Sequence, residues 1–357
     1  SIIMALINHI KLKKEKEQLM IIGLTIILIL VLLLPFTVKL VEKNLEAFLF
    51  VMGIIAALIS GVLTADLWLK ALRDPILITI AVLAAGLLFK WFQSPIEKGI
   101  SSFSRIIPYR LFLAIIVIVL GLISSIITAI IAALVLVAIV SVLHLDRQSE
   151  LRLIILACYS IGLGAALTPI GEPLSTIATS KLNEDFFYLL SLIGADVIPI
   201  VVAFGILAAV LIKPKTSAES LSSDLTSETY GEIFIRSFKV YLFVMGLTLL
   251  GAGFEPFIER YLLGLSPYIL YWINMISAIL DNATLAAAEI SPAMDEPTLR
   301  AILLGLLISG GMLIPGNIPN IIAAGKLNIT SKEWARLGVP LGLIAMAIYF
   351  LFILFVH

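Results

Sequence analysis

Long apolar segments follow one another along the chain, and short polar stretches separate them. A window of about 19 residues finds uninterrupted apolar segments near 19–41, 45–63, 75–92, 188–212, 232–253 and 338–356. Most of them reach the 20 or so residues that an α-helix needs to cross the hydrocarbon core of a bilayer. The pattern therefore predicts six ordinary transmembrane helices, of which the first carries no cleavage signature and is expected to remain as a span.

Two further apolar segments differ from these six. Residues 109–143 form a run that is too long for one crossing unless the helix is strongly tilted, but two arms of about 17 residues would fold back as a re-entrant hairpin. Residues 267–290 are the shorter counterpart, because 277–284 aligns with 124–131. We therefore predict two hairpins, and an interrupted helical segment follows each of them, at 151–181 and 298–327.

The two interrupted segments carry a repeated motif. Residues 168–183 read Thr-Pro-Ile-Gly-Glu-Pro-Leu-Ser-Thr-Ile-Ala-Thr-Ser-Lys-Leu-Asn, and residues 313–328 read Leu-Ile-Pro-Gly-Asn-Ile-Pro-Asn-Ile-Ile-Ala-Ala-Gly-Lys-Leu-Asn. Aligned without a gap, they share one glycine, an Ile-Ala pair and the final Lys-Leu-Asn. Proline, glycine and polar residues interrupt the hydrogen bonding of a membrane helix, and a pair of interrupted helices in the two halves of a chain indicates a transport site.

These elements predict an all-α polytopic membrane protein with two inverted repeats, each with a re-entrant hairpin and a discontinuous transmembrane helix. If the hairpins enter and leave on one side, three crossings separate them and the second repeat is inverted; if both are full crossings, the repeats are parallel. We favour the inverted arrangement, because it brings both interrupted helices to the midplane. The predicted division is scaffold helices at 1–108, a first repeat at 109–212, a polar linker at 213–231, and a second repeat with a scaffold helix at 232–357.

The composition supports a membrane protein and excludes several functions. Hydrophobic residues make up 61% of the chain and charged residues 13%, so a water-soluble fold could not bury its apolar surface. The 24 Lys and Arg balance the 24 Asp and Glu, and no basic run favours a nucleic-acid partner. A single cysteine cannot form a disulfide within the chain, and the three histidines are too scattered for a metal site. A Walker A sequence is absent.

The distribution of Lys and Arg over the loops bears on orientation. Placing both termini outside puts most of these residues on the cytoplasmic side, whereas the cluster from Lys11 to Lys16 argues the opposite way. We favour termini outside, and the opposite orientation stays open.

Candidate binding residues lie where the helices are interrupted, because free backbone groups at membrane depth are tolerated only in a cavity or inside protein. Glu172 precedes Pro173 at the start of a half-helix, where the helix dipole stabilises an anion, and Asn317 is its counterpart. Asp281 and Asn282 mark the predicted tip of the second hairpin. The remaining candidates are hydroxyl or amide residues of the same four regions: Thr168, Ser175, Thr176, Asn320, Ser124, Ser125, Thr128, Ser277 and Thr284.

Two carboxylates with a ring of hydroxyl and amide oxygens suit a hard cation such as Na⁺ and a competing proton, so Glu172 and Asp281 are the predicted metal ligands. For Glu172 the alternative is a simple helix cap, and for Asp281 it is an anchor that shapes the hairpin tip. Asp196 lies inside a predicted span as a structural partner or a proton relay. Three acidic residues at a segment end beside prolines are predicted to be solvated: Glu289, Asp295 and Glu296.

The motifs at 168–176 and 277–284 resemble the paired motifs of NhaD-type sodium/proton antiporters, within the ion transporter superfamily. The chain is still more similar to an archaeal and bacterial family of that superfamily whose members are taken to be cation transporters. The resemblance covers roughly 109–340 and implies a homodimer and an elevator-like movement of a transport domain against a scaffold. It places Glu172 at the antiporters' acidic position, and Asp281 with Asn282 at the second tip. Those antiporters carry an Asp-Asn pair at the first tip, where this chain has Thr128 and Ala129.

We therefore predict a secondary active transporter of the cell membrane, not an enzyme, that exchanges a monovalent cation, Na⁺, for protons. Na⁺ and H⁺ are its transported or coupling ions, and no other cofactor is expected. The alternative is a proton- or Na⁺-coupled carrier of an anionic substrate, either a di- or tricarboxylate or an arsenite-like oxyanion, because half-helix N-termini aimed at the midplane favour anions. An intramembrane protease and a channel are less favoured.

Overall fold

The computed structural model describes residues 2–143, 145–212, 229–261, 265–280 and 282–356. This part of the chain folds into α-helices and two short 3₁₀-helices and contains no strand. The all-α class predicted from the sequence is confirmed.

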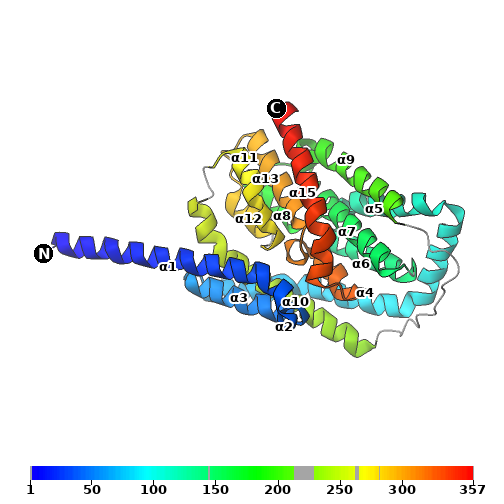
Figure 1. Ribbon diagram of the computed structural model, residues 1–357, viewed down its shortest axis with the longest axis horizontal. Helices are drawn as coiled ribbons and strands as arrows, with labels where there is room; N and C mark the ends of the chain where they lie inside the picture. The colour runs from blue at the N-terminus through cyan, green and yellow to red at the C-terminus, as the bar shows by residue number, and fades with distance from the viewer. Residues whose placement is uncertain (1, 144, 213–228, 262–264, 281, 357) are drawn as a thin grey trace.

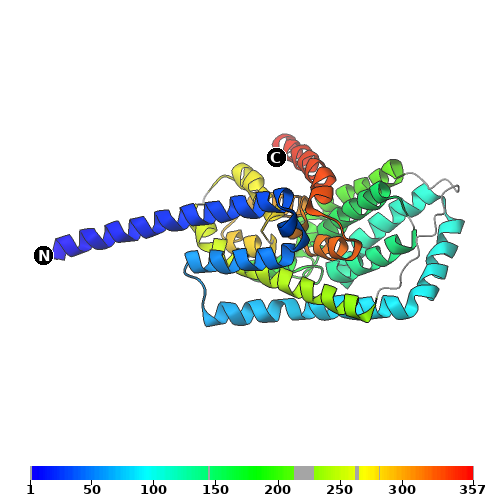
Figure 2. The ribbon, with the colours of Figure 1, turned by 60° about the horizontal axis from the view of Figure 1, so that its bottom comes forward.

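One group of helices lies along one side of the molecule, and both ribbon views show it (Figures 1 and 2). It consists of α1 (Ile2–Thr37), α2 (Lys39–Lys43), α3 (Leu45–Ile59), α4 (Ala65–Ile106) and α10 (Tyr230–Tyr261). Helix α10 packs along α3 so closely that a Cβ atom on Gly53 would lie 2.6 Å from the carbonyl oxygen of Gly246. Helix α10 thus joins the first 106 residues, although more than a hundred residues separate them in sequence.

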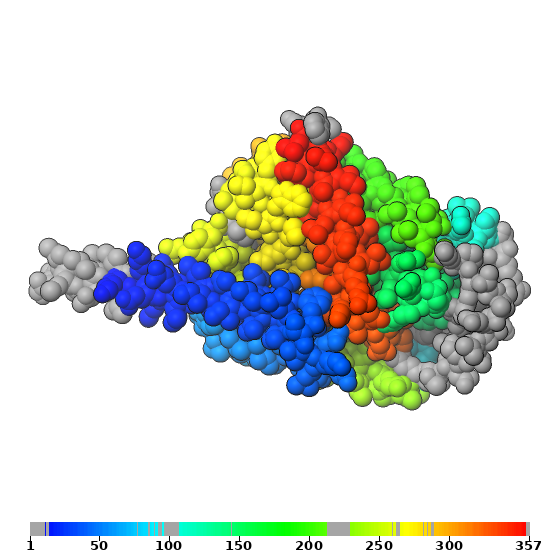
Figure 3. Space-filling view, viewed as in Figure 1, coloured from blue at the N-terminus to red at the C-terminus, as the bar shows by residue number. Residues whose placement is uncertain are grey.

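The remaining helices form a bundle above this group. Its first part is α5 (Tyr109–Ile127), α6 (Ala129–Leu143), α7 (Arg147–Ala165), α8 (Pro173–Leu182) and α9 (Tyr188–Leu211). Its second part is α11 (Pro267–Ile273), η1 (Asn274–Ala278), α12 (Asn282–Glu289), α13 (Glu296–Gly310), η2 (Ile314–Gly316), α14 (Ile318–Leu327) and α15 (Ser331–Val356). Helices α7 and α13 are buried over most of their length, whereas α15 lies on the surface between α9 and α11 (Figure 3).

Six helices in the described residues are long and apolar enough to cross a membrane, which indicates a multi-pass membrane protein. They are Lys14–Thr37, Ala65–Leu88, Tyr109–Ile127, Tyr188–Leu211, Tyr230–Ile258 and Ser331–Leu354. Five of the six predicted crossings correspond to members of this set. The segment predicted at 45–63 does not, because α3 has only 15 residues and extends about 22 Å, less than the roughly 30 Å of a hydrocarbon core. Tyr109–Ile127, predicted as a hairpin arm, takes the sixth place.

Helices α7 and α13 each begin with an aspartate that caps the helix. The carboxylate of Asp146 accepts the backbone N–H of Ser149 at 3.1 Å, and that of Asp295 accepts the N–H of Thr298 at 3.1 Å. Both aspartates are exposed. Hydrogen bonds from Ser149 and Thr298 lower the pKa of the respective carboxyl groups below the usual value. These two helices therefore start with the ordinary stabilisation of a helix N-terminus.

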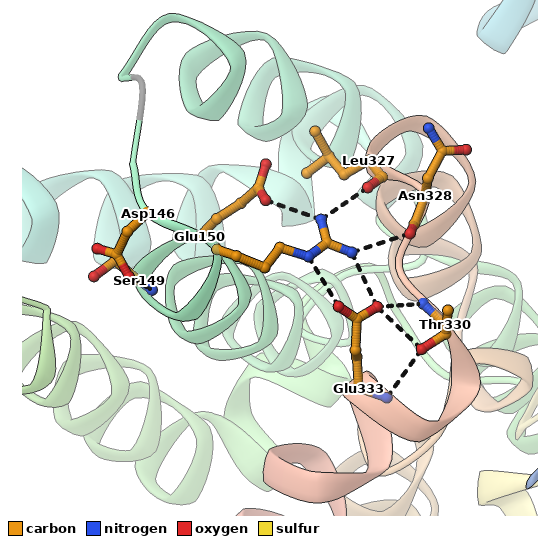
Figure 4. A network of polar contacts seen from close by, with 8 residues as sticks. Asp146, Ser149, Glu150, Leu327, Asn328, Thr330 and Glu333 are labelled. Carbon is orange, nitrogen blue, oxygen red and sulfur yellow. Dashed lines mark hydrogen bonds and ion pairs between the residues drawn. The ribbon is translucent and has the colours of Figure 1, made fainter. Parts of the chain in front are cut away.

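Arg147, at the start of α7, ties this helix to the end of α14 and the start of α15 (Figure 4). Its Nε and Nη2 atoms donate to the two carboxylate oxygens of Glu333 at 2.9 Å each, and Nη1 donates to Glu150 at 3.0 Å. Nη1 and Nη2 also donate, at 3.0 Å each, to the carbonyl oxygens of Leu327 and Asn328. All five guanidinium N–H groups thus have an acceptor, and the bond to Glu333 contributes most to raising the pKa of Arg147.

Candidate functional site

A cleft of about 390 Å³ lies where four separate parts of the chain meet. These parts are the junction of α5 and α6, the turn between α7 and α8, the start of α12, and the start of α14. The polar side chains among its lining residues are Thr128, Glu172, Thr176, Asn282 and Asn317. Five candidates predicted from distant parts of the sequence therefore lie around one space.

The two turns that border the cleft have similar backbone structures, although only the second contains a 3₁₀-helix, η2. Helices α7 and α13 end, and helices α8 and α14 begin, at equivalent positions of the gap-free repeat. In each turn the N–H of the shared glycine donates to the carbonyl three residues earlier, at 3.2 Å for Gly171 and 3.3 Å for Gly316. Helices α8 and α14 both end at an asparagine in the left-handed conformation, Asn183 and Asn328. The sequence repeat is thus a repeat of local structure.

The shared glycines are required by close backbone packing within each turn. A Cβ atom on Gly171 would lie 1.9 Å from the carbonyl oxygen of Ala165, and one on Gly316 would lie 2.5 Å from that of Gly310. Neither position can hold a side chain unless the turn opens. Each turn therefore folds back against the end of the preceding helix, and the residue after the glycine is brought to the start of the next helix.

That next residue is Glu172 in the first turn and Asn317 in the second. Both occupy the N-cap position with an extended backbone, at φ −154° in each case, and neither side chain makes a capping hydrogen bond. Both are buried, with 6% and 4% of their surface exposed. Glu172 thus occupies the N-cap position, as the helix-cap alternative requires, but its carboxylate does not cap the helix. The residue lines the cleft instead.

Thr128 connects α5 to α6 and is the strained point of the site. Its backbone lies at φ 77° and ψ 149°, a region that β-branched residues rarely adopt and that costs about 1–3 kcal/mol. The N–H of the next residue, Ala129, donates to the carbonyl of Gly171 at 2.8 Å. This bond joins the tip of the α5–α6 pair to the first turn and holds the Thr128 side chain at the cleft.

The two lining asparagines are held differently. Asn317 packs onto α7, because a Cβ atom on Gly162 would lie 2.2 Å from its Nδ2 atom. Asn282 is 4% exposed, and its Nδ2 atom has no hydrogen-bond partner among the described residues. A buried amide donor without a partner is costly and calls for an explanation. A position facing a ligand or water in the cleft supplies one.

Six predicted residues are buried close by but do not line the cleft: Ser124, Ser125, Thr168, Ser175, Ser277 and Asn320. All except Ser175 donate to backbone carbonyls. Ser124 reaches Ile161 of α7 at 3.0 Å, and Ser277 reaches the equivalent Leu306 of α13 at 2.9 Å. The hydroxyls of Ser124 and Ser277 thus fix one helix to another, as is common for such side chains in membrane bundles, whereas the hydroxyl of Ser125 bonds within α5.

Two further candidates lie partly or wholly outside the residues that the structure describes. Asp281 lies outside the described residues, although its neighbour Asn282 lines the cleft. Thr284 belongs to α12, but its side chain lies outside the described part of the structure. Most of the predicted linker, at 213–228, is outside it as well.

Asp196 of α9 is not among the residues that line the cleft. It is 8% exposed, and its Oδ2 atom lies 3.5 Å from Nη1 of Arg300 in α13. Of the two alternatives for this residue, structural pairing has a partner in the structure, and the proton relay stays a prediction.

Glu289 was predicted to be solvated, and this is wrong. The residue is only 1% exposed, because α12 packs against α8, α10 and α13, and its Oε2 atom accepts a 3.0 Å hydrogen bond from Nδ2 of Asn274. Asp295 and Glu296 are exposed as predicted. The sequence held a signal for this contact, since Asn274 and Glu289 are placed symmetrically about the predicted hairpin tip at 281–282, and folding there brings them together.

The family model described as "Protein of unknown function (DUF1646)" matches residues 21–356, nearly the whole chain. The chain therefore belongs to this family. No curated protein matches it.

Proposed function

We propose that this member of the DUF1646 family is a secondary active transporter of the cell membrane, which exchanges a monovalent cation, Na⁺, for protons. The observation that carries the proposal is the cleft, where a buried carboxylate and two buried amides from both halves of the chain meet. Binding sites of secondary transporters typically lie between two related halves, at turns that interrupt membrane helices.

The repeated turns support the architecture that such a transporter needs. In the proposed arrangement, α7 with α8 and α13 with α14 are two discontinuous membrane helices, and α5–α6 and α11–α12 are re-entrant hairpins of two inverted repeats. Non-helical backbone at membrane depth is tolerated where it lines a cavity, and both turns border the cleft. The resemblance to NhaD-type antiporters and to the ion transporter superfamily belongs to this proposal.

The proposed chemistry is competition for one site. The carboxylate of Glu172, the amide oxygens of Asn282 and Asn317, and the hydroxyls of Thr128 and Thr176 are the hard oxygen ligands that Na⁺ prefers. A buried carboxylate is costly unless a cation or a proton neutralises it. One ion or one proton at a time therefore satisfies the site. From the sequence alone, Asp281 belongs to the same ligand set.

The helix arrangement supports an elevator-like movement. Helices α1, α3, α4 and α10 form the proposed scaffold, and they pack on one another (Figure 2). The hairpins and turns form the proposed moving part, which carries the cleft between the two faces of the membrane. A homodimer would join two scaffolds, as the resemblance implies.

The test is pH-driven Na⁺ uptake into proteoliposomes. Glu172→Gln and Asp281→Asn are expected to abolish exchange, whereas Asp295→Asn, which changes an exposed acid to an equally good helix cap, keeps it. Folding is checked by a single monodisperse peak in detergent. Full exchange by Glu172→Gln contradicts the proposed site.

A carrier of an anionic substrate is the second candidate, and one observation favours it. Helices α8 and α14 both begin at the cleft without a side-chain cap, and an uncapped helix N-terminus attracts anions. Glu172 opposes it by repulsion. Thermal stabilisation by Na⁺, Li⁺, K⁺, Mg²⁺, citrate and arsenite separates the two, because a ligand that prefers the folded protein raises its melting temperature.

A further inference from the structure

Glu289 and Asn274 form a second buried polar site, distinct from the residues that line the cleft. Asn274 begins η1 and is fully buried, and Glu289 ends α12 with 1% of its surface exposed. Nδ2 of Asn274 donates to Oε2 of Glu289 at 3.0 Å. The remaining polar atom of each side chain, Oδ1 of Asn274 and Oε1 of Glu289, is buried and has no hydrogen-bond partner among the described residues.

The charged groups of the elements packed against α12 make no ion pair with Glu289 among the described residues. Lys181 of α8 binds the backbone of the residue that follows Glu289, since its Nζ atom donates to the carbonyl of Ile290 at 3.4 Å. On α13, Arg300 pairs with Asp196 and Asp295 caps the helix, while Glu296 is exposed. On α10, Lys239 pairs with Glu46 and Arg260 pairs with Glu17. Glu232 accepts a hydrogen bond from Thr229, and Arg236 lies beside Gly86. Glu255 is exposed. In the described residues Glu289 thus has no ion-pair partner.

An ionised Glu289 would be poorly stabilised here. A buried carboxylate with one hydrogen bond and no cation is strongly disfavoured relative to the same group in water. A single proton on Oε1 changes this, because it turns an orphan acceptor into a donor. The acid and the amide can then form two hydrogen bonds, from Asn274 Nδ2 to Glu289 Oε2 and from Glu289 Oε1 to Asn274 Oδ1, and both orphan oxygens are satisfied.

We propose that Glu289 and Asn274 form a proton-binding site, in which Glu289 is a neutral acid while α12 is packed as it is here. When Glu289 releases the proton to water, the carboxylate left behind needs water or a cation, so α12 must open first. Helix α12 also carries Asn282 of the cleft, seven residues and about 10 Å away along the helix. The inference that this proton is the one exchanged for Na⁺ rests on the proposed function.

Difference infrared spectroscopy of the purified full chain tests the proton site without any transport assay. The wild type is expected to show the C=O stretch of a protonated carboxyl group at neutral pH. Glu289→Gln, which keeps the shape of the side chain, removes this band, whereas Glu296→Gln, its matched exposed control, keeps it. A band that persists unchanged in Glu289→Gln, or a wild type without one, overturns the proposal.

Asn274→Val provides a second variant that leaves the acid in place. Its protonated carboxyl band is expected to remain and to move to higher frequency, because the C=O group loses the amide hydrogen bond. An unchanged band frequency contradicts the pair.

Transport then separates the two proposals. Glu289→Gln is expected to slow pH-driven Na⁺ exchange at least tenfold while Na⁺ still stabilises the protein against heating. If the wild type shows no pH-driven Na⁺ exchange, the proposed function fails, yet the infrared band of Glu289 still decides the proton site. If Glu172→Gln is inactive and Glu289→Gln exchanges normally, the coupling role of Glu289 fails and the proposed function stands.

Discussion

Two pairs of helices in the bundle, α7 with α13 and α8 with α14, start with an acidic or amide residue at the N-cap, and the two pairs use it differently. At α7 and α13 the exposed Asp146 and Asp295 accept the N–H three residues later, at 3.1 Å. At α8 and α14 the buried Glu172 and Asn317 occupy the same position and make no capping bond. Similar residues at one helix position therefore serve the helix at the surface and border the cleft in the interior.

The two pairs differ in what lies beyond the helix start, which is the cleft for α8 and α14. A helix N-terminus leaves up to four N–H groups without an intrahelical partner. Proline does not distinguish the pairs, because Pro297 removes a donor from the capped helix α13 as Pro173 and Pro319 do from α8 and α14. The remaining donors and the helix dipole point towards the space beyond the start of the helix. At the cleft, a side chain that makes no capping bond therefore lies beside the positive end of a helix. The following variants test this difference between the two pairs of helix starts.

The largest effect is expected from Gly162→Ala, which adds a methyl group on α7 where the side chain of Asn317 packs. The new Cβ atom would lie 2.2 Å from Nδ2 of Asn317, so the amide must leave its place at the cleft. Overpacking of this kind costs about 1–3 kcal/mol, and exchange in proteoliposomes should fall at least tenfold. Gly325→Ala is the matched control, because no atom lies within 4 Å of its Cβ position. It should keep exchange, and equal exchange in both variants contradicts the role of Asn317.

The next effect comes from Asn317→Asp, which makes the two interior positions alike. A second carboxylate at the cleft should tighten Na⁺ binding by about tenfold, or about 1.4 kcal/mol, as measured by isothermal titration calorimetry. Asn320→Asp is the contrasting change, because Nδ2 of Asn320 donates to the carbonyls of Gly310 and Leu313 at 2.9 Å each. It should lower the melting temperature without tightening Na⁺ binding. Weaker Na⁺ binding by Asn317→Asp would count against a cation site.

The smallest effect is expected at the surface, from Asp146→Ala. Losing this cap should destabilise the protein by about 1 kcal/mol and leave exchange unchanged, as measured by thermal unfolding and by flux. The pKa of Asp146 is lowered in the folded protein, mainly by Ser149, so its contribution is present above the unfolded value near 3.8 and disappears as the pH falls through the folded value. The difference in melting temperature between wild type and variant should therefore shrink in acid, and a constant difference argues against the cap.

The sequence predicted the turns well because their cause is local. The glycine, the proline and the polar residue of each motif determine where α8 and α14 begin. The two helices begin at equivalent positions of the gap-free repeat. The same is true of the junction at Thr128, where a long apolar run had to fold. Segment length was harder to predict, because α3 ends at Ile59, before the end of the predicted segment 45–63, and Tyr109–Ile127 alone is long enough for a span.

The side-chain contacts were harder to predict because they depend on packing between helices. Ser124 and Ser277 were predicted as binding residues, but neither lines the cleft, and the carbonyls that accept their hydrogen bonds lie 37 and 29 residues away. Glu289 was misjudged because an acid beside prolines at a segment end is usually exposed. Only the folding of α12 against α8 and α13 buries it.

The five-bond arginine at the start of α7 has a mechanical consequence. It donates hydrogen bonds to the carbonyls at the end of α14 and to Glu333 in the first turn of α15. Helix α7 of the first half is therefore linked to two helices of the second half. If the cleft moves across the membrane, α7, α14 and α15 move as one rigid body. The interface between the moving part and the scaffold then does not run between these three helices. A spin label at Gln148, in the exposed first turn of α7, and one on the exposed face of α15 would then keep a constant separation through the cycle, while labels at Gln148 and on α3 would not.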